Sequence, residues 1–323
     1  MMKRKFWHII TVSMCIWLLS IQAFAAEYLV PGGQVIGICL EDGCVRVAAF
    51  DEQLGKQAIA DGLQDGDRIL SINEIQIHSA ADIRRALERA DGFVKVLVER
   101  DGAKIPLEIT PALTSQGPRL GIYLKQGVTG VGTVTWYDPD SGTFGALGHG
   151  VNSANGELLT MERGSAYPAG VQSVKKGETG APGQLIGALR STTAIGDIAK
   201  NTPQGIFGTS PIGWEGERLP VAGVDEIHTG PATIRSTVRG DVIQEYSVEI
   251  LKIYPKAGAS GRNLLLKVTD PTLLATTGGI VQGLSGSPII QDGKLVGAVT
   301  HVLVNDPTTG YGIFIENMLD AAA

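Results

Sequence analysis

The sequence is poor in aromatic residues and in charge of either sign. Aromatic side chains make up 6% of the 323 residues, which disfavours a surface that stacks the bases of single-stranded nucleic acid. The formal net charge is −6 at pH 7, so no excess of basic residues is available to neutralise a phosphate backbone. These two shortages argue against nucleic acid as a partner.

Cysteine is scarce as well. Of the three cysteines, Cys15 lies in an apolar N-terminal segment, while Cys39 and Cys44 flank Asp42-Gly43. This dipeptide is typical of a two-residue hairpin turn, which would place the two cysteines diagonally and suit a disulfide poorly. We therefore favour free thiols, with a local disulfide left open. Two cysteines without a partner histidine are weak evidence for a metal site, and we expect neither a metal nor an organic cofactor.

Long helical periodicity is missing after about residue 113. The chain contains 43 glycines without a fixed period, which excludes collagen, and its short β-rich runs alternate with Gly and Pro turns. Examples of such runs are residues 130–137, 246–254 and 264–269. This pattern predicts a mostly β fold, with a barrel or sandwich of about 200 residues toward the C-terminus.

The N-terminus has the pattern of an export signal. Lys3, Arg4 and Lys5 precede residues 6–26, which carry no charge and include the small-residue pattern Ala23-Phe24-Ala25. The pattern predicts that residues 1–26 form a secretory signal peptide or a retained membrane-anchor helix. With either outcome, the basic residues before the apolar run place the rest of the chain outside the cytoplasm.

Residues 27–112 contain patterns of strands and one helix. Strands are expected over 34–40, 45–50, 93–100 and 104–110, and a helix over 80–89 after a capping-box-like start at Ser79. The run from Gly62 to Asn73, GLQDGDRILSIN, resembles the turn of bacterial protease-linked PDZ domains.

The resemblance implies that residues 27–112 form a PDZ domain, which binds a peptide as an extra strand at a sheet edge. We expect the helix 80–89 to form the other wall of the groove. The peptide-binding edge is then predicted at Gly33, Gln34, Val35, Ile36 and Gly37, although the usual glycine pattern of the carboxylate-binding loop is not plainly present there.

The strongest chemical signal is Gly283-Leu-Ser285-Gly286-Ser-Pro288, followed by a hairpin pattern with its turn at Asp292-Gly293. A glycine-flanked turn exposes a serine hydroxyl, and it lets the amides of Gly283 and Ser285 point to one spot as an oxyanion hole. The segment resembles the nucleophile loop of chymotrypsin-like serine proteases. Ser285 is therefore the predicted nucleophile, against the alternative of a plain glycine-rich turn.

A serine nucleophile needs a base, and histidine is the usual one. Of the five histidines, His149 lies between two glycines after a predicted strand and precedes Ser285 by 136 residues. That spacing suits one catalytic residue from each of two barrels. The orienting acid stays open by spacing alone among Asp140, Asp197, Asp225, Asp241, Asp270 and Asp306.

Over nearly its whole length the chain resembles the SpoIVB peptidase family, the stage IV sporulation protein B peptidases of endospore-forming bacteria. The most specific segment is residues 279–302, GIVQGLSGSPIIQDGKLVGAVTHV. The resemblance implies a signal or anchor (1–26), a PDZ domain (27–112) and a chymotrypsin-like double β-barrel peptidase domain (113–323). It also implies catalytic roles for Ser285, His149 and Asp270, and a threonine needed for activity at Thr300. Asp270 could instead support the local structure of the nucleophile loop, and Thr300 could hydrogen-bond the acid or line the substrate cleft.

The family resemblance further implies a place and a target. An exported peptidase of this kind acts in the space between mother cell and forespore, where it cleaves a membrane-protein inhibitor of an intramembrane metalloprotease. That cleavage triggers processing of pro-sigma-K, and the peptidase also cleaves itself. The PDZ ligand would be a peptide of its own chain or of the target, and the N-terminal segment would provide membrane contact.

Two other functions remain open from the sequence. One is a catalytically silent PDZ scaffold that binds the tails of membrane proteins, and the intact Ser285 and His149 motifs weigh against it. The other is a general extracytoplasmic quality-control protease, against which the N-terminal position of the predicted PDZ domain argues.

Overall fold

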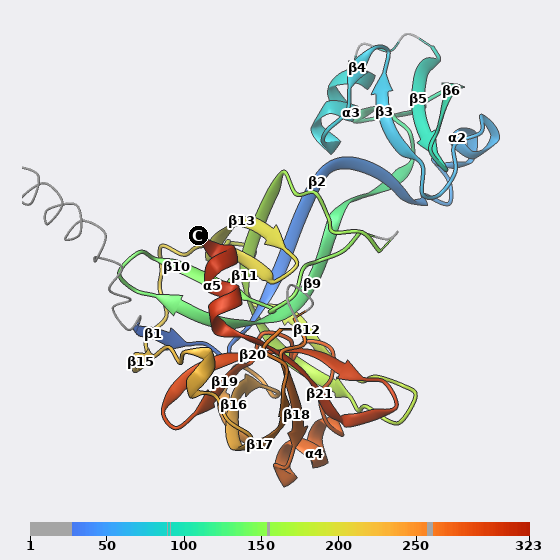
Figure 1. Cartoon of the computed structure of the whole chain (residues 1–323). Coiled ribbons are helices and arrows are strands. Elements are labelled where there is room, and N and C mark those ends of the chain that lie inside the picture. The colour runs from blue at the N-terminus through green and yellow to red at the C-terminus, as the bar shows by residue number, and fades with distance from the viewer. Residues whose placement is uncertain (1–27, 89, 91, 154–155, 257–260) are drawn as a thin grey trace, which may run out of the picture.

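The computed structural model describes residues 28–88, 90, 92–153, 156–256 and 261–323. The predicted signal or anchor over 1–26 lies outside these residues. Within the described ranges, no helix is both long and apolar enough to cross a membrane. Two barrels form the body of the molecule, and a smaller module projects from it on two long strands (Figure 1).

The N-terminal barrel is a ring of six strands, whose successive pairings run β2–β9–β10–β14–β13–β11 and return to β2. The ring consists of the first half of β2 (Val35–Phe50), most of β9 (Ile122–Asp138), β10 (Thr143–Ala146), β11 (Arg163–Lys175), β13 (Gly196–Thr202) and β14 (Gly205–Thr209). Phe144, Ile206 and Leu40 are fully buried inside it. Outside the ring lie β1 (Tyr28–Pro31) and β15 (Leu219–Pro220), which pair with each other, and β12 (Gln184–Leu189), which pairs with β11.

The C-terminal barrel is closed in the order β16–β17–β18–β21–β20–β19. Its strands are β16 (Gly230–Thr237), β17 (Ile243–Ile253), β18 (Leu264–Val268), β19 (Pro288–Gln291), β20 (Lys294–Leu303) and β21 (Asp306–Phe314), and its helices are the short η1 (Val224–Glu226), α4 (Pro271–Thr277) and α5 (Ile315–Ala322). Alternate apolar residues of these strands fill its core, among them Ile234, Ile250 and Leu266. The predicted double-barrel, mostly β fold is thus confirmed.

The projecting module is a sheet in the order β9–β2–β3–β5–β6 with two helices. It uses the second half of β2, the start of β9, and β3 (Arg68–Ile72), β5 (Val94–Arg100) and β6 (Ala103–Ile109). The remaining elements are α2 (Lys56–Ala60), β4 (Ile75–Gln76), α3 (Ala80–Leu87), β7 (Ala112–Thr114) and β8 (Gly117–Arg119). Ile69, Val94 and Leu87 lie in a core that the module does not share with the barrels.

Asp67, within the GLQDGD turn, holds the module together through a buried ion pair. Its carboxylate oxygens contact Arg100 Nε at 2.6 Å and Nη2 at 2.7 Å, and Oδ2 also accepts from the Gln64 amide at 2.8 Å. Arg100 reaches on to the Gly62 carbonyl at 2.8 Å. Asp67 therefore has a structural role in this turn.

The hairpin predicted at Asp42-Gly43 is wrong. Strand β2 continues through both residues and pairs with β9 on either side of a bulge between Leu40 and Val45. The left-handed φ of +64° at Gly43 lies in that bulge. A turn signal gives way here because β9 offers partners along nearly the whole strand. Cys39 and Cys44 are free thiols, as favoured above.

The predicted peptide-binding edge over Gly33–Gly37 is also wrong. From Ile36 the strand pairs with β11 on one side and with β9 on the other, so it has no free edge. The segment therefore belongs to the N-terminal barrel. The module is formed by the chain that connects β2 to β9, together with the adjoining ends of these two strands. Elsewhere the predicted helix over 80–89 appears as α3, and the strands over 93–100 and 104–110 appear as β5 and β6.

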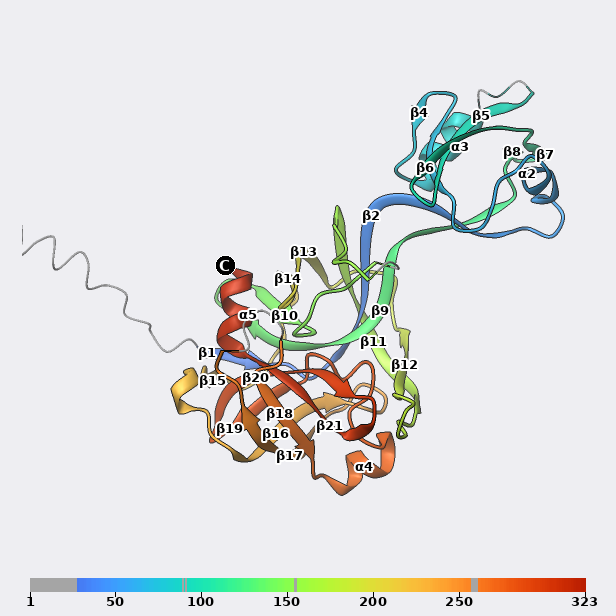
Figure 2. The same cartoon turned by 45° about the vertical axis from the view of Figure 1, so that its right-hand side comes forward.

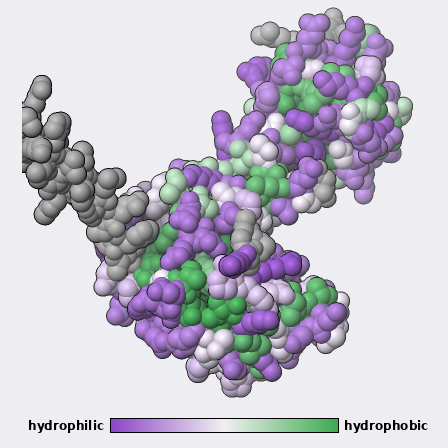
Figure 3. Space-filling view, in the orientation of Figure 1, coloured by the Kyte–Doolittle hydropathy of each residue, from purple (hydrophilic) through white to green (hydrophobic). Residues whose placement is uncertain are grey.

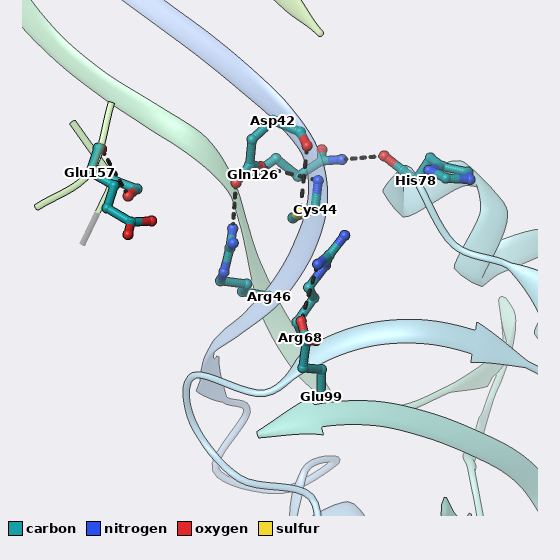
Figure 4. A network of polar contacts seen from close by, with 9 residues as sticks. Asp42, Cys44, Arg46, Arg68, His78, Glu99, Gln126 and Glu157 are labelled. Atoms are coloured by element: carbon teal, nitrogen blue, oxygen red, sulfur yellow. Dashed lines mark hydrogen bonds and ion pairs between the residues drawn. The ribbon is translucent and has the colours of Figure 1, made fainter. Parts of the chain in front are cut away.

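Figure 2 shows β2 and β9 leaving the barrel together toward the module, and Figure 4 shows polar contacts along them. Gln126 of β9 donates to the carbonyl of His78 in the module at 3.1 Å, whereas Arg46 pairs with Asp42 within β2 at 2.8 Å. The surface of the module in Figure 3 is mostly hydrophilic, whereas apolar residues gather over part of the barrel body in the same view. The mainly polar face of the module agrees with its separate core, because a unit that packs little against the barrels exposes its surface to water.

Candidate active site

The nucleophile loop lies between α4 and β19 and is anchored by one buried side chain. Leu284 is fully buried, its amide donates to Val281, and its carbonyl accepts from the Ser287 hydroxyl at 2.7 Å. Gly286 has a φ of +95°, and a Cβ on it would lie 2.0 Å from the carbonyl oxygen of Thr133. Only glycine lets the loop approach the N-terminal barrel this closely.

Gly283 and Ser285, the predicted oxyanion pair, are both anchored through their carbonyls. Thr133 of β9 hydrogen-bonds to both carbonyls. Its hydroxyl donates to the Gly283 carbonyl oxygen at 2.8 Å, and its amide donates to the Ser285 carbonyl oxygen at 3.1 Å. Within the described residues neither amide of this pair donates to a backbone carbonyl. Both remain available for a carbonyl oxygen that gains negative charge.

His149 follows β10 in the other barrel, where the chain turns sharply. Leu147 and Gly148 both have positive φ, +71° and +69°. The imidazole Nδ1 lies 2.9 Å from the carbonyl of Gly150, and because a carbonyl only accepts, a hydrogen bond here requires the proton on Nδ1. Burial lowers the pKa of His149, so the ring is neutral near pH 7, with the lone pair on Nε2.

Ser285 and His149 line one pocket of about 490 Å³. Its walls come from both barrels: Ile38, Val128, Val131, Leu147 and Val151 from the first, and Ile280, Val281, Gln282, Gly283, Thr300, His301, Val302 and Val304 from the second. A cleft between two barrels, with a serine from one and a histidine from the other, suits attack on a carbonyl carbon. A larger cavity of about 780 Å³ under α5 contains neither residue.

Thr300 contacts the serine through its backbone. The Ser285 hydroxyl donates to the Thr300 carbonyl at 2.7 Å, whereas the Thr300 hydroxyl is buried near the carbonyls of Gly261 and Tyr311, at 2.8 and 3.2 Å. The side chain thus holds β20 in place and, within the described residues, hydrogen-bonds to no acidic side chain.

The structure does not bring Asp270 to His149. Asp270 is the N-cap of α4: Oδ1 accepts from the amides of Thr272 and Leu273, both at 2.9 Å. It does not line the pocket of Ser285 and His149. The expected role as orienting acid is therefore corrected, because the carboxylate is used to cap a helix.

Two residues at the site escaped the sequence reasoning. The ring of His301 lies 5.3 Å from that of His149, and its buried Nδ1 has no hydrogen-bond partner in the described structure. Asn201 of β13 bonds to the loop after His149. Asn201 lies at the end of a strand before a turn, where the sequence gives no chemical signal. The signal for His301 was its position directly after Thr300, a predicted site residue.

A second groove, of about 400 Å³, lies on the module between α3 and the start of β9. Residues 122–126 of β9 pair with β2 on one side, and no strand in the described residues pairs with their other side. Ile122, Tyr123 and Leu124 line the groove, together with Leu120 and Gly121. The segment Leu120-Gly121-Ile122, an apolar–Gly–apolar pattern at the start of a strand, was the sequence signal that could have located the groove.

Comparison with known proteins gives the family. The model of the SpoIVB peptidase S55 family matches residues 116–319, so the chain belongs to that family of serine peptidases. The matched range excludes β1 and β2, although the first half of β2 completes the N-terminal barrel.

Other similarities are partial. The putative zinc metalloprotease R01501 of Rhizobium meliloti (strain 1021) is 30% identical over 142 residues, 44% of this chain and 34% of the relative. The putative zinc metalloprotease BR1156/BS1330_I1152 of Brucella suis biovar 1 (strain 1330) is 34% identical over 82 residues, 25% of this chain and 22% of the relative. The chain thus spans about a third or less of these relatives.

Among solved structures, the Rv3671c protease is similar in two forms. The inactive form has a TM-score of 0.35 and 13% identity and covers 59% of this chain and 81% of its own. The active form, from M. tuberculosis, has a TM-score of 0.36 and 13% identity, with 60% and 72% covered.

Proposed function

We propose that this chain is an exported serine endopeptidase in which Ser285 is the nucleophile and His149 the base. The observation that carries the proposal is the pocket between the barrels, lined by both side chains. His149 Nε2 accepts the Ser285 proton as Oγ attacks the scissile carbonyl, and the amides of Gly283 and Ser285 stabilise the oxyanion. The protonated imidazole then donates to the leaving amine, and water hydrolyses the acyl-enzyme. Before attack the Ser285 hydroxyl rotates away from the Thr300 carbonyl.

The target we propose is a regulatory membrane protein that inhibits an intramembrane metalloprotease, in the space between mother cell and forespore. Family membership supports this substrate class, and cleavage there would release processing of pro-sigma-K. We also expect cleavage of the chain by itself. Export and membrane contact through residues 1–26 rest on the sequence pattern described above.

The test is expression of the intact chain and of Ser285→Ala in an endospore-forming host that lacks its own peptidase of this family. The parent is expected to restore pro-sigma-K processing and spore formation and to shorten with time, and Ser285→Ala to do neither. Processing restored equally by both would favour a silent scaffold. Broad cleavage of casein by the purified parent would favour a quality-control protease instead.

For the module we propose a PDZ-type peptide-binding role at the groove between α3 and β9. The side of residues 122–124 that no strand of the described chain pairs with, and the apolar Leu120 and Ile122, support it, because an added strand needs an unpaired edge and a wall of side chains. The ligand class is the C-terminal tail of the target or a peptide of this chain.

Binding of fluorescent peptides with a free or an amidated C-terminus tests that role. Arg84 lines the groove and Arg85, its neighbour on α3, does not. Arg84→Glu is expected to weaken binding of the free-carboxylate peptide at least tenfold, and the matched Arg85→Glu to leave it within threefold. Equal binding by both variants would place the ligand elsewhere.

A further inference from the structure

The base of this peptidase lacks the usual partner. In the described part of the chain the hydrogen bond to His149 Nδ1 goes to the backbone carbonyl of Gly150, at 2.9 Å, and not to a carboxylate. A serine peptidase needs something to keep the proton on Nδ1 and the lone pair on Nε2. The question is what holds that carbonyl in place.

The Gly150 carbonyl belongs to the same planar peptide group as the Val151 amide. That amide donates to Asn201 Oδ1 at 2.9 Å. Because the group is planar and trans, its carbonyl points away from its N–H. The hydrogen bond from the Val151 amide to Asn201 therefore fixes this peptide group with the Gly150 carbonyl directed at the imidazole on its opposite side.

Asn201 is itself fully engaged. Its Nδ2 donates to the carbonyls of Val151 and Leu159, each at 2.9 Å. Only an amide fits this set of one donor and two acceptors, because an aspartate would set its negative oxygen against two carbonyls. The orientation of the Asn201 amide is fixed by the same contacts.

The approach of the two segments is built into the backbone. Asn201 lies at the end of β13, one residue before the turn to β14, and a Cβ on Gly150 would lie 2.7 Å from the Thr202 carbonyl oxygen. Because Gly150 has no side chain, the β13–β14 hairpin can approach the loop that follows His149. Thr202 fixes the turn through a bond from its hydroxyl to the Gly205 carbonyl at 3.1 Å.

We infer that Asn201 is the positioning residue of the catalytic base: through the Gly150–Val151 peptide it holds His149 with the proton on Nδ1. The inference rests on the proposed role of His149 as the base. The three groups form one hydrogen-bond chain, in which each bond polarises the next. A neutral chain of this kind sets the tautomer without adding a negative charge beside the imidazolium.

The experiment is ¹⁵N NMR of the histidine rings in the full chain, which has only five histidines, with His149→Gln for assignment. The parent is expected to show His149 protonated on Nδ1. In Asn201→Ala the ring is expected to become a mixture of tautomers, and the rate of labelling by a fluorophosphonate to fall at least 100-fold. The matched control Thr202→Val removes the two hydrogen bonds of the Thr202 hydroxyl from the same hairpin and is expected to keep the parent's tautomer and a rate within threefold.

A parent ring protonated on Nε2 would overturn the inference without any variant, so a failure of Asn201→Ala to fold does not leave it undecided. An unchanged His149 signal in folded Asn201→Ala would overturn it as well, as would equal losses in Asn201→Ala and Thr202→Val. If the parent shows the Nδ1 tautomer, Asn201→Ala abolishes it and neither protein labels, the positioning role holds and the serine peptidase assignment fails.

Discussion

At the scale of single residues, the site depends on backbone positions that admit only glycine. Gly283 has a φ of +100°, and a Cβ there would lie 3.0 Å from Leu185 Cβ. We expect Gly283→Val to remove turnover almost completely, because the loop must twist and the Gly283 amide leaves the oxyanion site. Loss of one such donor typically costs 10²–10³ in kcat. Peptide turnover, with circular dichroism to check folding, measures it, and near-normal turnover would refute the oxyanion assignment.

The pKa values of the two histidines at the site predict that activity falls at acidic pH. Burial lowers the pKa of His149 below 6.5. Burial, with His149 and Arg262 as further causes, lowers the pKa of His301 to about 4. Because only neutral His149 can accept the serine proton, the rate should be flat above pH 6.5 and fall as pH drops through the lowered pKa.

Fluorophosphonate labelling rates between pH 4 and 8 at constant ionic strength test this dependence. The half-maximal rate is expected below pH 6.5. A midpoint above 6.5 would contradict the lowered pKa and would mean that the groups favouring the charged ring outweigh its burial.

At the scale of elements, Asp270 and α4 give the sharpest contrast with the usual triad. Asp270→Asn keeps a good N-cap and is expected to lower turnover less than tenfold, whereas loss of an orienting carboxylate costs about 10⁴-fold. Asp270→Ala should destabilise the chain by about 1 kcal/mol through the lost cap. Kinetics and urea unfolding measure the two effects. A 10⁴-fold loss in a stable Asp270→Asn would restore the triad role.

Features whose sequence signals lie close together along the chain were predictable, whereas pairings between distant strands were not. The Asp292-Gly293 hairpin and α3 were predictable because their signals lie within a few residues, whereas the role of Ser285 stays a prediction. The cap at Asp270 was readable too, since Asp followed by Pro is a helix-start signal, but the family pattern took precedence. Pairing of β2 with β9 and β11 was not predictable, because no local pattern reveals a partner 72 to 132 residues away.

At the scale of the whole molecule, the module is inserted between two strands of one barrel. A chain of residues 113–323 lacks Val35–Leu40, and with it one strand of the ring. We expect this fragment to be insoluble. Because Leu40 pairs with Val128, replacement of residues 41–127 by Asn-Gly should close an ordinary hairpin and leave both barrels folded.

Solubility, circular dichroism and fluorophosphonate labelling of the two shortened chains test this architecture. The hairpin version should label at Ser285, although it lacks the peptide groove. A soluble, reactive 113–323 fragment would contradict the insertion and support a simple order of two domains.

The most direct test of the central claim is fluorophosphonate labelling of residues 27–323 beside Ser285→Ala, with mass spectrometry to locate the label. The account predicts a single modified residue, Ser285, in the parent, and no label in the variant. If the parent is folded and stays unmodified, or if the label falls on another residue, then Ser285 and His149 do not form the catalytic pair described above.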